Sequence, residues 1–255
     1  MLINTLVALL ASTAALAAPT KVQKRDATPS QSLTPTESLI LELKAADTAV
    51  QRNQILVQAG GNASFTFDFA NPPPAAVVSS PAGKLVTASG ATAPFLTDIN
   101  AALGLVVIQP CGLILPHLHP RADEFVIVTQ GEVYTQFISE TGATLIENQL
   151  NTFGSVLLPK GSIHLEYNPT CEPASFVAAF NSNDPGVSFV AANLFSLEDQ
   201  LVIAALGGDA VVSGADLETI RQALPQGLAT GVAECVSKCG IKPYSKRSLA
   251  EVYGK

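Results

Sequence analysis

The three histidines of this 255-residue chain lie close together in the sequence, at positions 117, 119 and 164. His117 and His119 are separated by one residue, so on a β-strand they would point to the same face, about 6.5 Å apart. Two imidazoles in that arrangement can share one metal ion. Glu124 adds a carboxylate just downstream, and His164 precedes another apolar run. An isolated histidine is more often a surface or core residue, but this combination predicts a metal site formed by all four side chains.

Three imidazoles and one carboxylate, with coordination positions left open for water, suit a borderline-to-hard divalent ion. The spacing alone excludes none of Fe²⁺, Ni²⁺ and Zn²⁺. One carboxylate leaves a net charge of about +1 on such a centre, which attracts anions and polarises a bound water or carboxylate. We therefore expect a small anionic or other small-molecule ligand at the metal.

The histidines fall in the middle of the chain, between residues 101 and 195, where short β-branched runs alternate with Gly, Pro and Asn. Evenly spaced short strands with turn residues between them are typical of a β-sandwich or barrel. The runs that we expect to form strands are Leu105–Gln109, Phe125–Thr129, Val133–Ile138, Ser155–Leu158 and Ser175–Phe180.

Both flanks of this region are expected to differ from it. Thr34-Pro35-Thr36-Glu37 forms a capping box with proline at the first helical position, so a helix should begin there and end near residues 51–56. We assign residues 34–100 to this helix and a Gly/Pro-rich extension that packs on the barrel core of 101–195. Residues 196–255 should be helical, with helices over 197–206, 215–224 and 228–239, each followed by Gly or Pro.

The N-terminus has the features of a secretory leader. A short apolar run ends in the small-x-small sequence Ala15-Leu16-Ala17, and Lys24-Arg25 is a dibasic pair of the kind that processing proteases cut. We expect a signal peptide over 1–17 and a propeptide or loose leader over 18–33. The mature protein should begin at or after Ala18, and at Asp26 if a protease cuts the dibasic pair. The location would then be extracellular or in the cell wall, with no membrane segment left after processing. The net charge of −7 argues against nucleic acid as a partner.

The cysteines and one sequon fit that compartment. The chain has four cysteines, Cys111, Cys171, Cys235 and Cys239. An even number of cysteines is expected to pair outside the cell, and four of them allow three different pairings. Free buried thiols are the alternative. Asn62-Ala63-Ser64 is an N-x-S sequence, so Asn62 is a candidate glycosylation site.

Two segments carry a resemblance to a known family. The segment from Gly112 to Glu124, with Gly131 beyond it, resembles the first motif of germin-type cupins, and Gly154 to Asn168, with the Pro159-Lys160-Gly161 turn, resembles the second. The resemblance to secreted germin-like and spherulin-like proteins implies a mainly β fold, the cupin double-stranded β-helix or jelly-roll barrel. It also implies Mn²⁺ as the ion, held by His117, His119, Glu124 and His164, and association into homo-oligomers. The stripe of Leu201, Ile203, Ala204 and Leu206 could be such a contact or could cover the barrel.

The cupin topology also implies a disulfide pairing. In this family the strand with the first two histidines lies antiparallel to the strand with the third, which would bring Cys111 and Cys171 face to face. Cys235 and Cys239 are four residues apart and would close a small loop. We therefore expect Cys111–Cys171 and Cys235–Cys239.

The resemblance leaves several functions open. Germins include oxalate oxidases and proteins credited with manganese-dependent superoxide dismutation, but the oxidases place an Asn where this chain has Ile114. Bicupin oxalate decarboxylases need two motifs, for which three histidines are too few. The other readings are a non-catalytic extracellular or developmental protein with a structural metal, and a receptor for a small apolar ligand. Arg121 could clamp an anion or tie down its loop. Glu166 and Asn168 could support the ligands or be ordinary strand residues.

Overall fold

A computed structural model describes residues 34–208, 211–225 and 227–241. The predicted signal peptide (1–17) and leader (18–33), with the Ala15-Leu16-Ala17 and Lys24-Arg25 sites, lie outside these residues. In the part of the chain that the structure describes, every helix is too short or too polar to cross a membrane.

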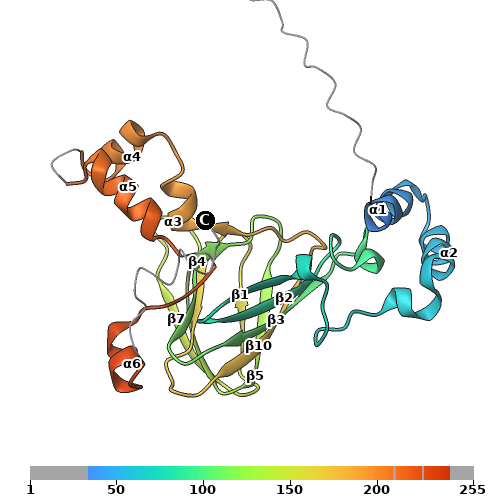
Figure 1. Ribbon diagram of the computed structural model, residues 1–255, viewed down its shortest axis with the longest axis horizontal. Helices are drawn as coiled ribbons and strands as arrows, with labels where there is room; N and C mark the ends of the chain where they lie inside the picture. Colours follow the sequence, from blue (N-terminus) through green and yellow to red (C-terminus); the bar gives the residue numbers. More distant parts are fainter. Residues whose placement is uncertain (1–33, 209–210, 226, 242–255) are drawn as a thin grey trace, which may run out of the picture. The chain divides into compact units, whose positions relative to one another are not determined.

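Two antiparallel sheets form the body of the fold (Figure 1). The first sheet has the strand order β1 (Val77–Ser80), β2 (Gly83–Ala88), β3 (Ala102–Ile108), β10 (Ala174–Phe180), β5 (Glu124–Gln130) and β8 (Ser155–Leu158). The second sheet has the order β11 (Ser188–Phe189), β4 (Gly112–Leu118), β9 (Ile163–Tyr167), β6 (Glu132–Ile138) and β7 (Ile146–Asn151), and β12 (Leu228–Thr230) pairs with β4. All five predicted strands are present, and the mainly β prediction is confirmed.

The core lies between the two sheets, because side chains alternate between inward and outward along each strand. In β5, for example, Val126 and Val128 are fully buried, whereas Phe125 and Ile127 are exposed to solvent. Phe176 of β10 and Val133 of β6 are also fully buried. Burial on one face only explains the alternating sequences of these strands.

The first sheet begins earlier than the sequence indicated. β1 and β2 lie within the segment 57–100 that we expected to be an extension, and β2 pairs with β3 along its whole length, from Gly83 opposite Ile108 to Ala88 opposite Leu103. The expected barrel boundary at residue 101 therefore falls inside a continuous sheet. The Pro72-Pro73-Pro74 run precedes these strands, and only the short 3₁₀ helix η2 (Pro74–Ala76) joins it to β1.

The predicted N-terminal helix is two helices, α1 (Pro35–Ala45) and α2 (Ala49–Gly60). The break occurs because Thr48 caps the start of a new helix. Its side chain accepts a hydrogen bond from the Gln51 backbone N–H, and the Gln51 side chain accepts one from the Thr48 backbone N–H. The expected sequon residue, Asn62, is exposed in the next element, the 3₁₀ helix η1 (Gly61–Phe65). A further 3₁₀ helix, η3 (Pro94–Leu96), precedes β3.

The C-terminal region contains α3 (Val190–Leu194), α4 (Asp199–Ala205), α5 (Gly214–Ala223) and α6 (Ala233–Lys238). Instead of one helix over 228–239, the chain first forms β12 and then α6, because residues 228–230 find hydrogen-bonding partners on the edge of β4. The apolar stripe 201–206 is split between two environments. Ile203 packs with Val202 and Leu217 inside the helical pair, while Leu201 is exposed.

The disulfide pairing that we expected is wrong. Cys111 bonds to Cys235 and Cys171 to Cys239. Cys111 and Cys171 do lie on neighbouring loops, since the Cys111 N–H donates to the Thr170 carbonyl at 3.3 Å. Both of their sulfurs nevertheless bond to cysteines of the C-terminal segment: Cys235 lies in α6, and Cys239 is the residue that caps the end of this helix. The cupin topology implied that Cys111 and Cys171 are close, but it did not place α6 against them.

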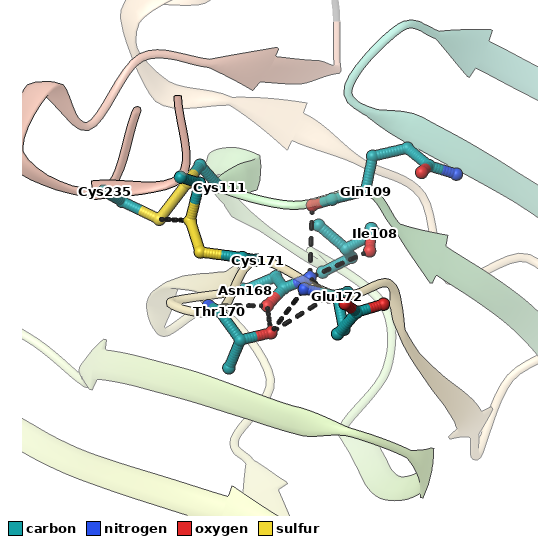
Figure 2. Close-up of a disulfide and its surroundings, with 9 residues drawn as sticks. Ile108, Gln109, Cys111, Asn168, Thr170, Cys171, Glu172 and Cys235 are labelled. Carbon is teal, nitrogen blue, oxygen red and sulfur yellow. Dashed lines mark hydrogen bonds between the residues drawn. A yellow bond between two sulfur atoms is a disulfide. The ribbon is translucent and has the colours of Figure 1, made fainter. Parts of the chain in front are cut away.

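Asn168 holds the loop that carries Cys171 (Figure 2). Its fully buried side-chain amide donates to the carbonyls of Ile108, Gln109 and Glu172 at 3.1, 3.2 and 2.8 Å, and its oxygen accepts from both the N–H and the hydroxyl of Thr170. Of the two roles left open for Asn168, the structure assigns loop support at the end of the barrel away from His164.

Replacing Asn168 with Ala should lower the free energy of unfolding by about 3 kcal/mol, because buried carbonyls would lose their donor. Urea unfolding followed by circular dichroism measures this change. Asn53→Ala, an exposed asparagine on α2, is the control and should change stability by less than about 0.5 kcal/mol. Equal effects of the two substitutions would contradict the role given to Asn168.

Candidate metal centre

The four predicted ligands converge at one end of the barrel. His117 lies near the end of β4, His119 just beyond it, Glu124 at the first position of β5, and His164 on β9 directly opposite His117. One ligand atom from each residue lies within 4.8 Å of every other. All four residues are less than a tenth exposed. The structure thus brings together the complete set that the sequence predicted.

The orientation of each imidazole is set by a backbone carbonyl. His117 Nδ1 bonds the Leu115 carbonyl at 2.9 Å, His164 Nδ1 bonds the Ser162 carbonyl at 2.9 Å, and His119 Nδ1 bonds the Gly186 carbonyl. A carbonyl oxygen only accepts, so in each ring Nδ1 must carry the hydrogen. In the neutral tautomer this leaves the Nε2 lone pair free, which is how histidine ligands of metals are commonly held.

A break in the β4–β9 ladder accompanies this arrangement. The register shifts between Ile114 and His117, where Pro116 has no N–H to donate to a neighbouring strand. In the same stretch the Leu115 N–H donates a hydrogen bond to the Gly227 carbonyl, and the Leu115 carbonyl accepts one from His117 Nδ1. The proline thus stands at the bulge that orients the first ligand.

The Nε2 atoms meet the Glu124 carboxylate. Glu124 Oε2 lies 3.1 Å from His119 Nε2 and 3.2 Å from His164 Nε2. With Nδ1 protonated and Nε2 bare, these short contacts place lone pairs against lone pairs, and both Glu124 Oε2 and His164 Nε2 are buried without a hydrogen-bond partner. A cation between these atoms, whether a proton or a metal ion, would turn the contacts into attraction. The donor set therefore fits a divalent metal.

The electrostatics favour the ligand forms of two of these groups at neutral pH. Burial lowers the pKa of His117 to about 3, and the neighbouring His164 lowers it further than Glu124 raises it. Burial raises the pKa of Glu124, but the close approach of His119 and His164 to its carboxylate outweighs this effect and brings the pKa to about 2. At pH 7 the site thus offers a carboxylate and a neutral His117, as metal binding requires.

Arg121 ties down the loop that orients His119. Its guanidinium donates to the Asp184 carbonyl at 2.8 Å and to the Asp184 carboxylate at 2.7 Å, and its N–H donates to the Pro185 carbonyl. The next residue, Gly186, supplies the carbonyl for His119. Of the two roles left open for Arg121, the contacts support the loop tie over the anion clamp.

The layer below the ligands inside the barrel is mixed in polarity. Glu166 follows His164 on the same inward face of β9 and lies opposite Ile114 on β4 and Thr135 on β6. Glu166 and Thr135 are fully buried, and their side-chain oxygens have no hydrogen-bond partner in the described structure. Burial, and then the charge of Glu124, raises the pKa of Glu166 well above its usual value. Ile114 points into the barrel and offers no donor.

Comparison with known proteins assigns the family. The family profile described as Cupin matches residues 67–209, which is more than half of the chain. The chain is a cupin. It is 34% identical to Spherulin-1A of Physarum polycephalum over 84% of this chain and 82% of that protein. It is also 35% identical to Germin-like protein subfamily 2 member 3 of Arabidopsis thaliana over 53% of this chain and 64% of that protein. This cupin is therefore of the spherulin-like and germin-like kind, as the two motifs indicated.

Solved structures agree at the level of the fold. A structure of oxalate oxidase superimposes with a TM-score of 0.57 at 24% identity, over 65% of this cupin and 83% of that chain. Oxalate decarboxylase from Bacillus subtilis gives a TM-score of 0.53 at 19% identity, over 60% of this cupin and 38% of that chain. At these identities the likeness supports the two-sheet cupin fold alone.

Sequence reasoning missed the groups that orient the ligands. The carbonyls of Leu115, Ser162 and Gly186 carry no side-chain signal. Phe180 contacts the His119 ring edge-on, and Phe189 lies beside the His117 ring, with centroids 4.7 and 5.8 Å apart. The Asp184-Pro185-Gly186 turn was the one available indication, since these residue types favour a turn.

Arg121→Ala should weaken metal binding by about tenfold, because the loop that orients His119 would lose its anchor. Competition with a chromogenic chelator measures the affinity. Arg52→Ala is the matched control, since Arg52 also bonds a carbonyl, that of Ala46, and pairs with Asp98 away from the site. Equal affinities for the two variants would contradict the role of Arg121.

The metal-free protein should lose stability as the pH falls from about 6.5 towards 3. The pKa of His117 is lowered to about 3 in the folded state, so over this window the unfolded chain binds a proton that the folded chain does not. This group contributes at most about 1.4 kcal/mol per pH unit. Urea unfolding of chelator-treated protein at several pH values measures the slope. His117→Gln, which does not titrate, should have a shallower slope, and an unchanged slope would contradict the assignment.

Proposed function

We propose that this cupin is an extracellular manganese-binding protein whose metal centre carries out one-electron oxidoreduction on a small ligand, of the superoxide dismutase type. The observation that carries the proposal is the meeting of three imidazole nitrogens and one carboxylate oxygen within 4.8 Å. The fixed Nδ1 hydrogens and the unpartnered Glu124 Oε2 support a preorganised cation site.

Manganese fits the donor set because the carboxylate adds a hard ligand to three imidazoles, and an ion bound there would supply an accessible redox couple and open coordination positions. The protein's own residues hold and orient the ion, exclude bulk water through their burial, and keep Glu124 ionised. The net charge of about +1 from one carboxylate on a divalent ion favours a small anion.

Ile114 argues against oxalate as the ligand. It lies in the buried core, next to the layer that contains Glu166, and provides no hydrogen bond to a dicarboxylate. A ligand with a single negative charge and few atoms is therefore preferred over oxalate.

A structural role for the metal is the second candidate. Glu124 belongs to the first sheet, whereas His117 and His164 belong to the second. A bound ion would therefore link the two sheets, and burial of all four ligands suits a stabilising role. The similarity to Spherulin-1A over most of both chains is compatible with a non-catalytic function of this kind.

Secretion and self-association remain part of the proposal. Two disulfides suit an oxidising compartment. For self-association, the outer face of the first sheet offers an apolar row across four strands. Ala179 of β10 lies between Leu103 of β3 and Phe125 of β5, and Leu157 of β8 lies opposite Phe125. The side chains of Leu103, Phe125 and Leu157 are exposed. A second copy of the chain would cover this row, which replaces the stripe 201–206 as the contact that we expect.

His119→Ala should bind less Mn²⁺ and lose the stability that the metal adds to wild type. With free metal at a hundredfold excess over its dissociation constant, that stability is about 2.7 kcal/mol. Metal analysis and melting temperature, each with and without chelator, measure both effects. Glu166→Gln is the control: it changes a buried carboxyl that is outside the ligand set, and this variant should retain the metal. If both variants keep the metal, or if both lose it equally, the assignment of His119 as a metal ligand would be contradicted.

Activity separates the two candidate functions. The Mn²⁺-loaded wild type should dismutate superoxide and should show little or no oxalate oxidation. His119→Ala should have neither the superoxide activity nor the oxalate activity. Ile114→Asn tests the reason given for the low oxalate activity, since it adds the missing donor. A loaded protein that stabilises with metal but does not dismutate superoxide would favour the structural role, and rapid oxalate turnover by wild type would overturn the argument from Ile114.

A further inference from the structure

The two disulfides lie next to each other in one compact sulfur cluster (Figure 2). One end of this cluster is exposed and the other is buried. Cys171 is exposed, whereas Cys111 is fully buried and Cys235 is 5% exposed. The Sγ atoms of Cys111, Cys235 and Cys239 all lie within 4.8 Å of one another, in a group that does not include Cys171. Across the two bridges, Cys239 Sγ lies 4.0 Å from Cys235 Sγ. One sulfur of the exposed bridge therefore stands beside one sulfur of the buried bridge.

The sulfur cluster lies at the C-terminal end of a segment that runs along β4, the strand that carries His117. β12 pairs with β4 from Leu228 opposite Ile114 to Thr230 opposite Gly112. The Gly227 carbonyl accepts from the Leu115 N–H, close to His117. α6 follows, and Cys235 within it and Cys239 at its C-cap make the covalent connections to the barrel. The segment 227–241 is thus held by hydrogen bonds near the metal site and by disulfides at its other end.

We propose that the four cysteines form a thiol–disulfide exchange site, through which a small dithiol or a dithiol protein releases α6 from the barrel. A thiolate of the dithiol attacks the sulfur of Cys171, the exposed residue of the pair, and Cys239 leaves as a thiolate. The second thiol of the reductant then closes its own disulfide and frees Cys171. The reductant gives up two electrons, and the Cys171–Cys239 bond accepts them.

The freed Cys239 thiolate then attacks Cys235 Sγ, its neighbour at 4.0 Å. The Cys235–Cys239 bond forms, the Cys111–Cys235 bond breaks, and Cys111 leaves as a thiolate that takes up a proton. This second step consumes no electrons. Residues four apart in a helix have Cα atoms roughly 6 Å apart, within the range that a disulfide spans. The products are one disulfide between α6 and its C-cap residue, and free thiols at positions 111 and 171, so no disulfide joins α6 to the barrel.

The buried bridge is thus opened from within the protein. Cys111 is inaccessible to an external reductant, and it becomes free only because Cys239 lies beside Cys235. Since β12 and α6 are continuous, release of α6 also removes the covalent hold on the segment that borders β4. Reduction at the surface thereby acts on the strand that carries His117.

Two matched variants test the exchange, because each lacks the exposed bridge and differs only in which thiol remains. Cys171→Ser leaves Cys239 beside the buried bridge, whereas Cys239→Ser leaves Cys171, which lies outside the close sulfur group. Each variant is alkylated at neutral pH without reductant and mapped by mass spectrometry. We expect loss of the Cys111–Cys235 peptide in Cys171→Ser, with a Cys235–Cys239 bond and alkylated Cys111 in its place. Cys239→Ser should keep Cys111–Cys235.

The same mapping on wild type with one equivalent of dithiothreitol covers the case in which a variant does not fold. We expect the product with alkylated Cys111 and Cys171 and a Cys235–Cys239 bond. Retention of Cys111–Cys235 in both Cys171→Ser and partly reduced wild type would overturn the proposal, as would equal exchange in the two variants. None of these measurements involves the metal, so their outcome is independent of the function proposed above.

Discussion

The contact between Glu124 and the bare Nε2 atoms of His119 and His164 is the constraint around which the barrel is arranged. Two acceptors 3.1–3.2 Å from a third repel unless a cation lies among them. The chain holds them there through backbone geometry: Pro116 stands at the break in the β4–β9 ladder, and the Arg121–Asp184 contact fixes the carbonyl opposite His119. Most of the cost of assembling these groups is therefore met by the fold before any ion binds.

The two sheets contribute unequally to this centre. The second sheet supplies the strand-borne histidines, and the first sheet supplies the single charged ligand at the start of β5. Below this layer, Ile114, Thr135 and Glu166 give the interior one apolar wall and a set of buried oxygens without partners. The ligand identities are those that the resemblance to germin-like cupins implied.

The ligand residues and the strand run that follows Glu124 were predictable because both depend on local patterns, whereas β4 and β9 were not among the expected strand runs. An HxH pair on a strand and alternating apolar residues are visible without knowledge of the fold. The capping box at Thr48 was equally local, and it divides the predicted helix into α1 and α2. The errors arose where a segment's partner is distant in the sequence. β1 and β2 form because β3 offers them an edge, residues 228–230 extend because β4 does, and the cysteine pairing depends on where α6 docks.

The pairing of β12 with β4 has a consequence for how the protein is made. Synthesis proceeds from the N-terminus, so β4 leaves the ribosome long before the strand that completes its edge. The Cys111–Cys235 bridge spans 124 residues of sequence, one of the longest closures in the described chain. Contacts of such separation form late and slow folding, since the intervening loop must be ordered first. The strand that carries His117 thus keeps an open edge during translation, and a nascent chain interrupted before residue 228 would expose that edge to pairing with other chains.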